Sequence, residues 1–413
     1  MCLCQLYAQS NKLKRKKKFL VIGCGGLPDK LYGASSIVFF QYLEYLLKKG
    51  NEVTFLSVTT KKLTNKEKNN FYKNFTKKKN IFLINQRSKK LYNFNKFNFL
   101  FKKIQTVNLD FSISKYLVNR SFDKILALDI AAASFAKKLD KNPFFVWLGD
   151  LNFSTIWYHF YYDYRKTFRY FAYYIFIKIF TTKWKNFYKT VLNNTKVISG
   201  SNVNIKELKK IGIVSKYIPY PWPKVYKQNI LVQKKKPSFV FFGNLIGLGS
   251  KSAINYLLGH IYPIYIDIWG EDGFVIYVCG AFILSNEFKI KIKESKNIVL
   301  MGYVEDINDL ASKCHGCIFP IDVPVGNRSR IVTAMGSRWP IIAHKNVSIG
   351  NPALISGSNC FLAKTPKDFG KFSRLIFNNK KLRKKLTLNA YNTYKSTFEP
   401  AKALSEFGKF INA

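Results

Sequence analysis

Short apolar runs alternate with helical patterns along both halves of the chain, and this alternation constrains the fold more than any other feature. Residues 19–22, 52–58 and 144–150 in the first half, and 238–245 and 298–301 in the second, have the length and apolarity of buried strands. Amphipathic segments with short links separate them. Such strand–helix–strand units predict parallel pairing with right-handed crossovers. We therefore predict an α/β chain made of two doubly wound domains.

A proline cluster divides the two halves. Pro219, Pro221 and Pro223 stand within five residues, and neither a helix interior nor a central strand accommodates this spacing. The Lys-rich run that ends at Pro237 completes a linker. We predict a basic tail at 1–18, an N-terminal domain at 19–222, a linker at 223–237 and a C-terminal domain at 238–398.

The net charge limits the partners. Of 413 residues, 68 are Lys or Arg and 23 are Asp or Glu, giving +45. Such a field attracts nucleic acid, anionic lipid or phosphorylated substrates, although a genome rich in A and T would also raise the Lys content without a binding reason. No recognised nucleic-acid motif accompanies the charge, so we expect no specific nucleic-acid partner.

Targeting and metal signals are weak. The apolar run after the basic tail ends after four residues, and no stretch of about 18 uncharged apolar residues occurs, so neither a signal peptide nor a spanning helix is predicted. The seven Cys include Cys314 and Cys317, but no second pair of ligands follows them. We predict reduced thiols, no metal site and a cytoplasmic protein.

A turn rich in small polar residues precedes a predicted helix in the second half. Gly326, Asn327 and Ser329 can aim backbone N–H groups at an anion. Arg328 and Arg330 add fixed charge and a fork geometry that suits phosphate oxygens. The pattern predicts a phosphate site, and a basic surface turn is the alternative.

Three other strand ends carry candidate residues. Gly243 and Asn244 follow the strand at 238–245, and Lys251 precedes a helix expected from about residue 253, which is suited to anion binding. Gly25 and Gly26 follow the first strand, where backbone can approach a ligand closely. Pro28 stands where a dinucleotide fold needs its third glycine, and the second strand does not end in an acid, so that fold is excluded.

Asp150 ends the strand at 144–150, the end at which parallel sheets place functional residues. It could instead cap the following helix. The next stretch, 157–188, interleaves many aromatic residues with Lys and Arg. A helix of this composition suits an anionic membrane surface, and a large helix packed on the sheet is the alternative.

Residues 302–343 resemble the C-terminal domain of retaining GT-B glycosyltransferases, in particular glycosyltransferase family 4. The motifs are the turn Gly302-Tyr303-Val304 and the segment that runs through Ala334-Met335 to a Pro-Ile-Ile-Ala strand. In that family the turn lies near the nucleobase of a sugar nucleotide, and the later segment holds the ribose and diphosphate.

The resemblance implies a donor site and two Rossmann-like domains facing a cleft, with the last helix, within 399–413, crossing back to the N-terminal domain. The implied donor-binding residues are Gly25, Gly26, Gly243, Asn244, Lys251, Gly302, Tyr303, Val304, Arg328, Ser329, Arg330 and Thr333. The implied catalytic residues are Asp150, near the acceptor, and the two arginines at the diphosphate.

Two positions depart from the family pattern. The two Glu that the family carries eight residues apart fall on Val325 and Thr333, and neither is acidic. The Arg that usually follows the glycine of the strand at 238–245 is Asn244. A bidentate contact to the ribose hydroxyls is therefore absent, and Thr333 offers at most a single hydrogen bond.

The resemblance implies transfer of a sugar from a nucleotide-sugar donor to a glycan or lipid-linked acceptor, in cell-envelope polysaccharide synthesis, with retention and without a bound metal or cofactor. Arg328, Arg330 and Lys251 would stabilise the leaving diphosphate. The protein would work in the cytoplasm or at the inner face of the membrane. A catalytically impaired sugar-nucleotide-binding protein and a nucleotide-dependent sugar epimerase are the alternatives.

Overall fold

The computed structural model describes residues 16–30, 33–93, 103–140, 144–164, 167–223, 235–280 and 286–412. Of the predicted basic tail, residues 1–15 lie outside this set, and so do residues 224–234 of the predicted linker. Contacts between Cα atoms group the chain into two compact units. Unit 1 holds Met1–Asn93, Gln105–Trp147 and Asn194–Lys196, and unit 2 holds Phe94–Ile104, Leu148–Asn193 and Val197–Ala413.

The first sheet has seven strands in the order β3-β2-β1-β4-β5-β6-β7. They are β1 (Lys18–Cys24), β2 (Glu52–Thr59), β3 (Ile81–Arg87), β4 (Lys124–Leu128), β5 (Phe145–Leu148), β6 (Lys196–Ser199) and β7 (Ser215–Tyr217). β1 pairs in parallel with both β2 and β4, so Phe19 lies beside Val53 on one side and Lys124 on the other. The strand order reverses between these neighbours, and an open parallel sheet binds ligands at such a point.

The interior strands form where the sequence has continuous apolar runs. Leu20, Val21 and Ile22 are fully buried, as expected for a parallel strand covered on both faces. The connecting helices are α2 (Ala34–Lys48), α3 (Asn65–Asn74), α4 (Phe111–Val118), α5 (Ile130–Lys138), α6 (Asn152–Tyr164), α7 (Arg169–Leu192) and α8 (Asn202–Lys210), with a short 3₁₀ turn at Lys78–Asn80. α3 begins with a capping box between Thr64 and Glu67.

The second sheet has six strands in the order β10-β9-β8-β11-β12-β13, and its neighbouring strands pair in parallel. They are β8 (Ser238–Phe242), β9 (Val275–Cys279), β10 (Ile298–Gly302), β11 (Gly316–Phe319), β12 (Ile341–His344) and β13 (Phe361–Ala363). Both described sheets are thus parallel and interleaved with helices, as the alternation of the sequence predicts.

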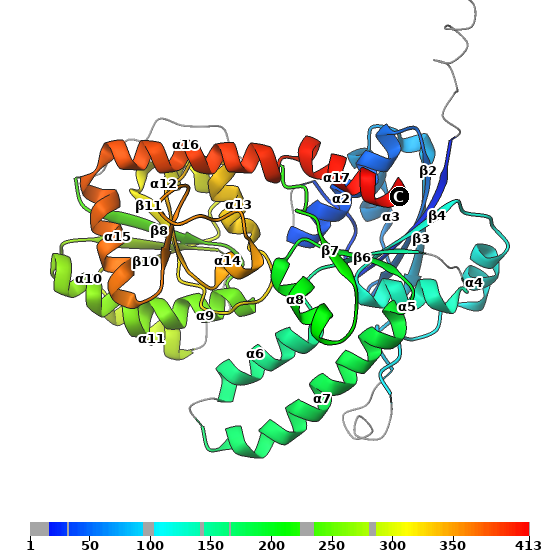
Figure 1. Ribbon diagram of the computed structural model, residues 1–413, viewed down its shortest axis with the longest axis horizontal. Helices are drawn as coiled ribbons and strands as arrows, with labels where there is room; N and C mark the ends of the chain where they lie inside the picture. The colour runs from blue at the N-terminus through cyan, green and yellow to red at the C-terminus, as the bar shows by residue number, and fades with distance from the viewer. Residues whose placement is uncertain are drawn as a thin grey trace, which may run out of the picture. The chain divides into compact units, whose positions relative to one another are not determined.

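Helices cover both faces of the second sheet (Figure 1). The described helices that follow β8 are α9 (Leu248–Tyr256), the π-helical turn Leu257–Ile261, α10 (Tyr262–Trp269), α11 (Asn286–Glu294), α12 (Ile307–Lys313), α13 (Ser329–Gly336), α14 (Val347–Gly350), α15 (Pro366–Asn378), α16 (Lys380–Thr397) and α17 (Pro400–Asn412). Figure 1 shows α9, α10 and α11 on one side and α12, α13 and α16 on the other. α17 is the helix predicted to cross back.

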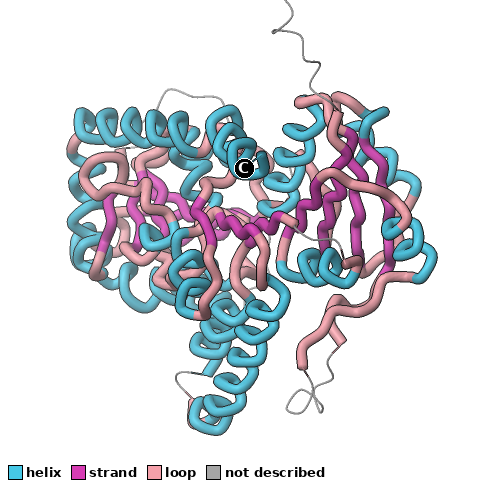
Figure 2. The backbone as a smooth tube through the Cα atoms, turned by 45° about the vertical axis from the view of Figure 1, so that its right-hand side comes forward, coloured by secondary structure: helices cyan, strands magenta, loops and turns pink. Residues whose placement is uncertain are grey.

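The aromatic stretch 157–188 differs from the prediction of one helix. It forms most of two helices, α6 and α7, which pack against each other as a hairpin (Figures 1 and 2). Rings hold the pair together: Phe160 stacks on Tyr170 with centroids 5.1 Å apart, and Trp157 meets Tyr174 edge-on at 5.7 Å. Among the described residues, no helix combines the length and the apolarity that crossing a bilayer requires.

Candidate active site

Two arginines at the start of α13 form the centre of the candidate site. Arg328 is the N-cap residue of α13, and Arg330 is its second helical residue. Two glycines make room for their guanidinium groups: a Cβ at Gly243 would lie 2.6 Å from Cζ of Arg330, and a Cβ at Gly249 would lie 3.1 Å from Cζ of Arg328. Gly243, just after β8, and Gly249, near the start of α9, have no side chains. They therefore leave space for the two guanidinium groups.

Both guanidinium groups keep hydrogen-bond donors without a protein partner. Nη2 of Arg330 donates to Oγ of Ser250 at 2.9 Å, and its Cζ lies 5.2 Å from the ring centre of Phe241. Nη1 of Arg330 and Nη2 of Arg328 are buried and bond to no described group. An unpaired buried donor is costly, and a cationic one more so. Such donors fit an anionic ligand with oxygen acceptors.

Burial also shifts the proton affinity of this pair. It lowers the pKa of Arg330 to about 9, and the charge of Arg328 acts in the same direction. Burial lowers the pKa of Arg328 as well, while Asp150 and Tyr220 oppose that shift. The two like charges repel each other, one nitrogen of each is shielded from water, and a bound anion would relieve the repulsion.

Asp150 lies beside this pair. It follows β5, and its carboxylate packs against Gly326, where a Cβ would come within 2.0 Å of Oδ1. The φ of Gly326 is +71°, in the left-handed region that favours glycine. The side chain of Asn327 donates to the carbonyl oxygen of Gly200 at 3.0 Å. These contacts fix the turn before α13 and keep a carboxylate close to Arg328.

Val325 and Thr333, the two positions where the family pattern has Glu, both make contacts inside the protein. Nε1 of Trp222 donates to Oγ1 of Thr333 at 2.9 Å, and both residues are buried. Val325, 2% exposed, belongs to an apolar cluster with Leu248 and Val323. Tyr158 and Tyr162 of α6 pack on that cluster. A ribose-binding carboxylate would fit neither environment, since one is filled by an indole and the other is apolar.

Lys251 lies inside a helix rather than just before one. The helix begins at Leu248 rather than near residue 253, so Lys251 lies in its first turn. Its ammonium group pairs with Asp163 of α6. In the described structure Lys251 therefore has a carboxylate partner, and its role as a phosphate ligand stays a prediction.

Asp322 is a functional candidate that the sequence did not identify, because it lies out of register with the family acids. Its carboxylate accepts hydrogen bonds from Tyr162 of α6 and Ser252 of α9. The side chain of Asn346 donates to its backbone carbonyl at 2.6 Å. Contacts from three separate segments hold it in place.

The other predicted donor residues lie at neighbouring strand ends. The amide of Gly280, after β9, donates to the carbonyl of Gly302 at 2.7 Å, and a Cβ at Gly280 would meet the carbonyl oxygen of Gly243 at 1.9 Å. Gly280 thus joins the turns after β8 and β10. Tyr303 is 69% exposed, and Val304 is half-buried. Asn244 is exposed and accepts a hydrogen bond from the amide of Ile246, while Ser329 opens α13.

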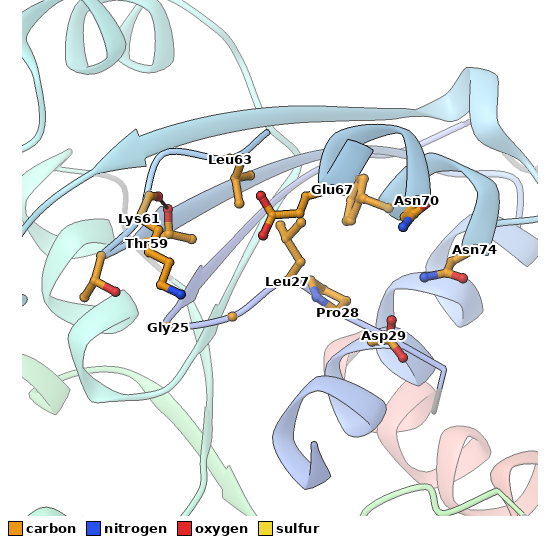
Figure 3. A pocket seen from close by; sticks show the side chains of 13 residues that line it. Gly25, Leu27, Pro28, Asp29, Thr59, Lys61, Leu63, Glu67, Asn70 and Asn74 are labelled. Carbon is orange, nitrogen blue, oxygen red and sulfur yellow. Dashed lines mark hydrogen bonds between the residues drawn. The ribbon is translucent and has the colours of Figure 1, made fainter. Parts of the chain in front are cut away.

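A pocket of about 370 Å³ lies in unit 1, at the carboxyl ends of β1 and β2. Gly25 and Gly26 line it, with φ +102° at Gly25 and its amide bonded to the carbonyl of Val58 at 3.0 Å. Figure 3 shows Asn70 and Asn74 of α3 near Asp29 at one end. The remaining lining residues are Leu27, Pro28, Thr59, Thr60, Lys61, Leu63, Glu67 and Phe71. The lining mixes apolar side chains with carboxylates, amides and hydroxyls, and the polar groups suit a ligand rich in hydroxyl groups.

Within the described ranges, no three His, Cys, Asp or Glu side chains lie close enough together to hold a metal ion. Cys314 and Cys317 are buried and not joined to another cysteine. The absence of a metal requirement stays a prediction.

Comparisons with known proteins identify the class. Residues 236–377 match the family described as Glycosyl transferases group 1. The fold is similar to HepE of Anabaena in complex with UDP and glucose, with 13% identity, a TM-score of 0.64, and coverage of 96% of this chain and 100% of that chain. A glycosyltransferase of Rickettsia africae gives 14% identity, a TM-score of 0.65, and 96% and 98% coverage.

A TarM variant of S. aureus, in complex with fondaparinux, alpha-GlcNAc-glycerol and UDP, gives 10% identity, a TM-score of 0.65, and 96% and 100% coverage. No curated protein sequence matches the chain. The chain therefore has the GT-B fold. Within it, residues 236–377 are similar to the group 1 glycosyltransferase family. The predicted fold class and family resemblance are confirmed, and the findings support the predicted nucleotide-sugar glycosyltransferase.

Proposed function

We propose that this protein transfers a sugar from a nucleotide-sugar donor to a glycan or lipid-linked acceptor in envelope polysaccharide synthesis. The observation that carries the proposal is the pair of buried guanidinium groups with unpartnered donors at Arg328 and Arg330. A diphosphate supplies the charge and the acceptor oxygens that these donors fit. The group 1 match and the UDP in the HepE and TarM structures support a nucleoside diphosphate as the ligand.

The reaction would be driven by electrostatics. As the glycosidic bond breaks, negative charge grows on the leaving diphosphate, and donors fixed before the reaction stabilise it without reorganising. Gly243 and Gly249 hold the space for Arg330 and Arg328, so the donors are preorganised. Asp150 keeps Arg328 charged and oriented, which makes it a positioning residue in this proposal.

Retention and metal independence are further parts of this proposal. Two cations supply the charge that a divalent metal ion would otherwise supply, so the proposed reaction needs neither metal nor cofactor. In a retaining reaction, the acceptor hydroxyl attacks the anomeric carbon from the same face of the sugar that the phosphate leaves. The phosphate oxygen can take the acceptor proton, and no separate general base is required.

The pocket of unit 1 is the proposed acceptor side. Gly25 and Gly26 open backbone to the ligand, and Asp29, Asn70 and Asn74 offer hydrogen bonds to sugar hydroxyls (Figure 3). We also place the protein at the inner face of a membrane, where lipid-linked acceptors are found. The exposed apolar face of α7 supports that position.

A second candidate is a sugar-nucleotide-binding protein without transferase activity. Val325 and Thr333 favour it, since both are engaged in packing where the family pattern has Glu. In that case the donor binds, but no sugar moves.

Release of nucleoside diphosphate tests these candidates. The full chain is incubated in EDTA with UDP-, GDP- or ADP-sugars and a polysaccharide or lipid-linked acceptor. We expect acceptor-dependent release with one nucleotide, loss of release in Arg328→Ala/Arg330→Ala, and no change in Arg374→Ala, which removes an exposed cation of α15. NMR of the product's anomeric proton reports retention. Binding without release favours the second candidate, and an epimerised sugar still attached to its nucleotide would identify an epimerase.

A further inference from the structure

α7 presents a line of exposed apolar side chains. Phe168, Phe171, Ile175 and Ile179 are 85%, 81%, 67% and 39% exposed. Their spacing of three, four and four residues places them on one face of the helix. We call these four residues the outer stripe. Single exposed apolar residues are ordinary, but a contiguous row marks an interaction surface.

The hairpin does not use the outer stripe for its own packing. Tyr170 and Tyr174 point the other way and stack against Phe160 and Trp157 of α6. Figure 1 shows the two helices running alongside each other over this length. The outer stripe therefore lies on the opposite side of α7 from these ring contacts, and its exposure needs another reason.

The same helix face becomes polar further along. Thr182, Asn186 and Lys189 continue the line toward the end of α7, and all three are exposed. The face thus stays exposed to water while its side chains change from apolar to polar after Ile179. A face that is apolar only in its first half argues against random drift in composition.

The charge around the outer stripe is uniform in sign. α7 contains five Lys and Arg and no Asp or Glu. Exposed Arg169 and Lys178 flank the stripe. The complement of such a face is an apolar layer beneath a negatively charged surface, which describes a bilayer with anionic headgroups. A nucleic acid would match the cations but not the phenylalanines and isoleucines.

We propose that the outer stripe docks α7 flat onto an anionic lipid bilayer, with Phe168, Phe171, Ile175 and Ile179 entering the headgroup boundary and Arg169 and Lys178 contacting lipid phosphates. This names the surface behind the membrane position proposed above, and it does not depend on glycosyl transfer. Docking would also orient α6, which packs against α7 and whose Tyr162 donates a hydrogen bond to Asp322.

Vesicle co-sedimentation of the full chain tests the docking. The probes are phosphatidylcholine vesicles and vesicles with about 30% phosphatidylglycerol. We expect binding to the anionic vesicles that weakens with salt. Phe171→Gln/Ile175→Gln should bind at least tenfold more weakly, because burying one such side chain changes partitioning by about tenfold.

Two matched variants separate the contributions. Ile290→Gln/Ile355→Gln removes side chains of similar exposure elsewhere, 56% and 59%, and should bind like wild type. Arg169→Gln/Lys178→Gln should lose affinity for the anionic vesicles and much of the salt dependence. Nucleotide binding should persist in all of these variants, which separates failure of docking from failure of the proposed transferase or of folding.

Three results would overturn the proposal. The first is no binding of wild type to anionic vesicles, and the second is equal binding by Phe171→Gln/Ile175→Gln. The third is a dimer of wild type that this variant disrupts in gel filtration, which would assign the outer stripe to a second copy of the chain.

Discussion

Replacing Arg330 by Met should stabilise the protein in the absence of donor and abolish its response to nucleotide. The guanidinium group of Arg330 is surrounded by protein, and its Nη1 has no partner among the described groups. Met keeps an apolar side chain of similar length over the ring of Phe241 while removing the charge. The same substitution removes a donor that the proposed diphosphate needs.

The magnitude follows from the pKa. Burial lowers the pKa of Arg330 to about 9, against about 12.5 for a solvated guanidinium, and one pKa unit corresponds to about 1.36 kcal/mol. The difference of about 3.5 units puts the cost of this buried charge at up to about 5 kcal/mol. The hydrogen bond to Ser250 and the contact with Phe241 offset part of it, about 2 to 3 kcal/mol together. We expect a net gain of about 1 to 3 kcal/mol, or a few degrees in melting temperature.

Urea and thermal unfolding of wild type and Arg330→Met, each with and without the nucleoside diphosphate that the wild type binds, measure both effects. Arg374→Met, at an exposed arginine of α15, is the control and should change stability by less than about 0.5 kcal/mol while leaving the nucleotide response intact. The reasoning is refuted if Arg330→Met is less stable than wild type without nucleotide, or if nucleotide protects both proteins equally.

Three further predictions concern Gly243 beside Arg330, Val325 in the apolar cluster, and the buried His315. Gly243→Ala should weaken nucleotide binding at least tenfold in calorimetric titration, because its Cβ would come within 2.6 Å of the guanidinium carbon of Arg330; unchanged affinity would contradict the proposed packing. Val325→Glu should lower the free energy of unfolding by about 2 to 4 kcal/mol rather than raise activity, since it places a carboxylate in an apolar cluster. Urea unfolding and nucleotide release measure the two outcomes. Burial lowers the pKa of His315 to about 4, and the charge of Arg383 acts in the same direction. Between about pH 6.5 and 4, His315 is therefore protonated in the unfolded chain but neutral in the folded chain. Stability should fall by up to about 3 kcal/mol as the pH drops through that window, and His315→Asn should show a shallower fall; identical pH profiles would argue against this assignment.

Much of the fold could be predicted from the sequence because apolar periodicity is a local property. Continuous runs such as residues 19–22 mark strands buried on both faces, and the helix at Pro366–Asn378 begins with the Thr365 and Asp368 capping box that its sequence spells out. The sequence pattern does not predict the break between α6 and α7. Aromatic residues fill both helices without a clear change of period, and stacking of Phe160 on Tyr170 fixes the hairpin.

The candidate site could be predicted only in part, because its decisive contacts join residues far apart in the sequence. The pattern around Arg328 and Arg330 indicated an anion site, and Gly243 was assigned to a turn. That Gly243 also makes room for Arg330 depends on how α13 packs against β8. The bond from Trp222 to Thr333 spans 111 residues, so it could not be seen in a local pattern.

The pairing of Lys251 with Asp163 also depends on tertiary packing, since it joins α9 to α6. The sequence placed Lys251 just before a helix, where phosphate binding is the usual expectation. The roles of the predicted site residues stay predictions until ligand binding is measured.

Calorimetric titration of UDP, GDP and ADP into the full chain, in EDTA, tests the central claim most directly. We predict that one of the three binds, and that Arg328→Ala/Arg330→Ala abolishes the heat of binding while Arg374→Ala preserves it. Binding that survives the double substitution would contradict the assignment of these arginines to the diphosphate. Absence of binding by all three nucleotides would contradict the donor site itself.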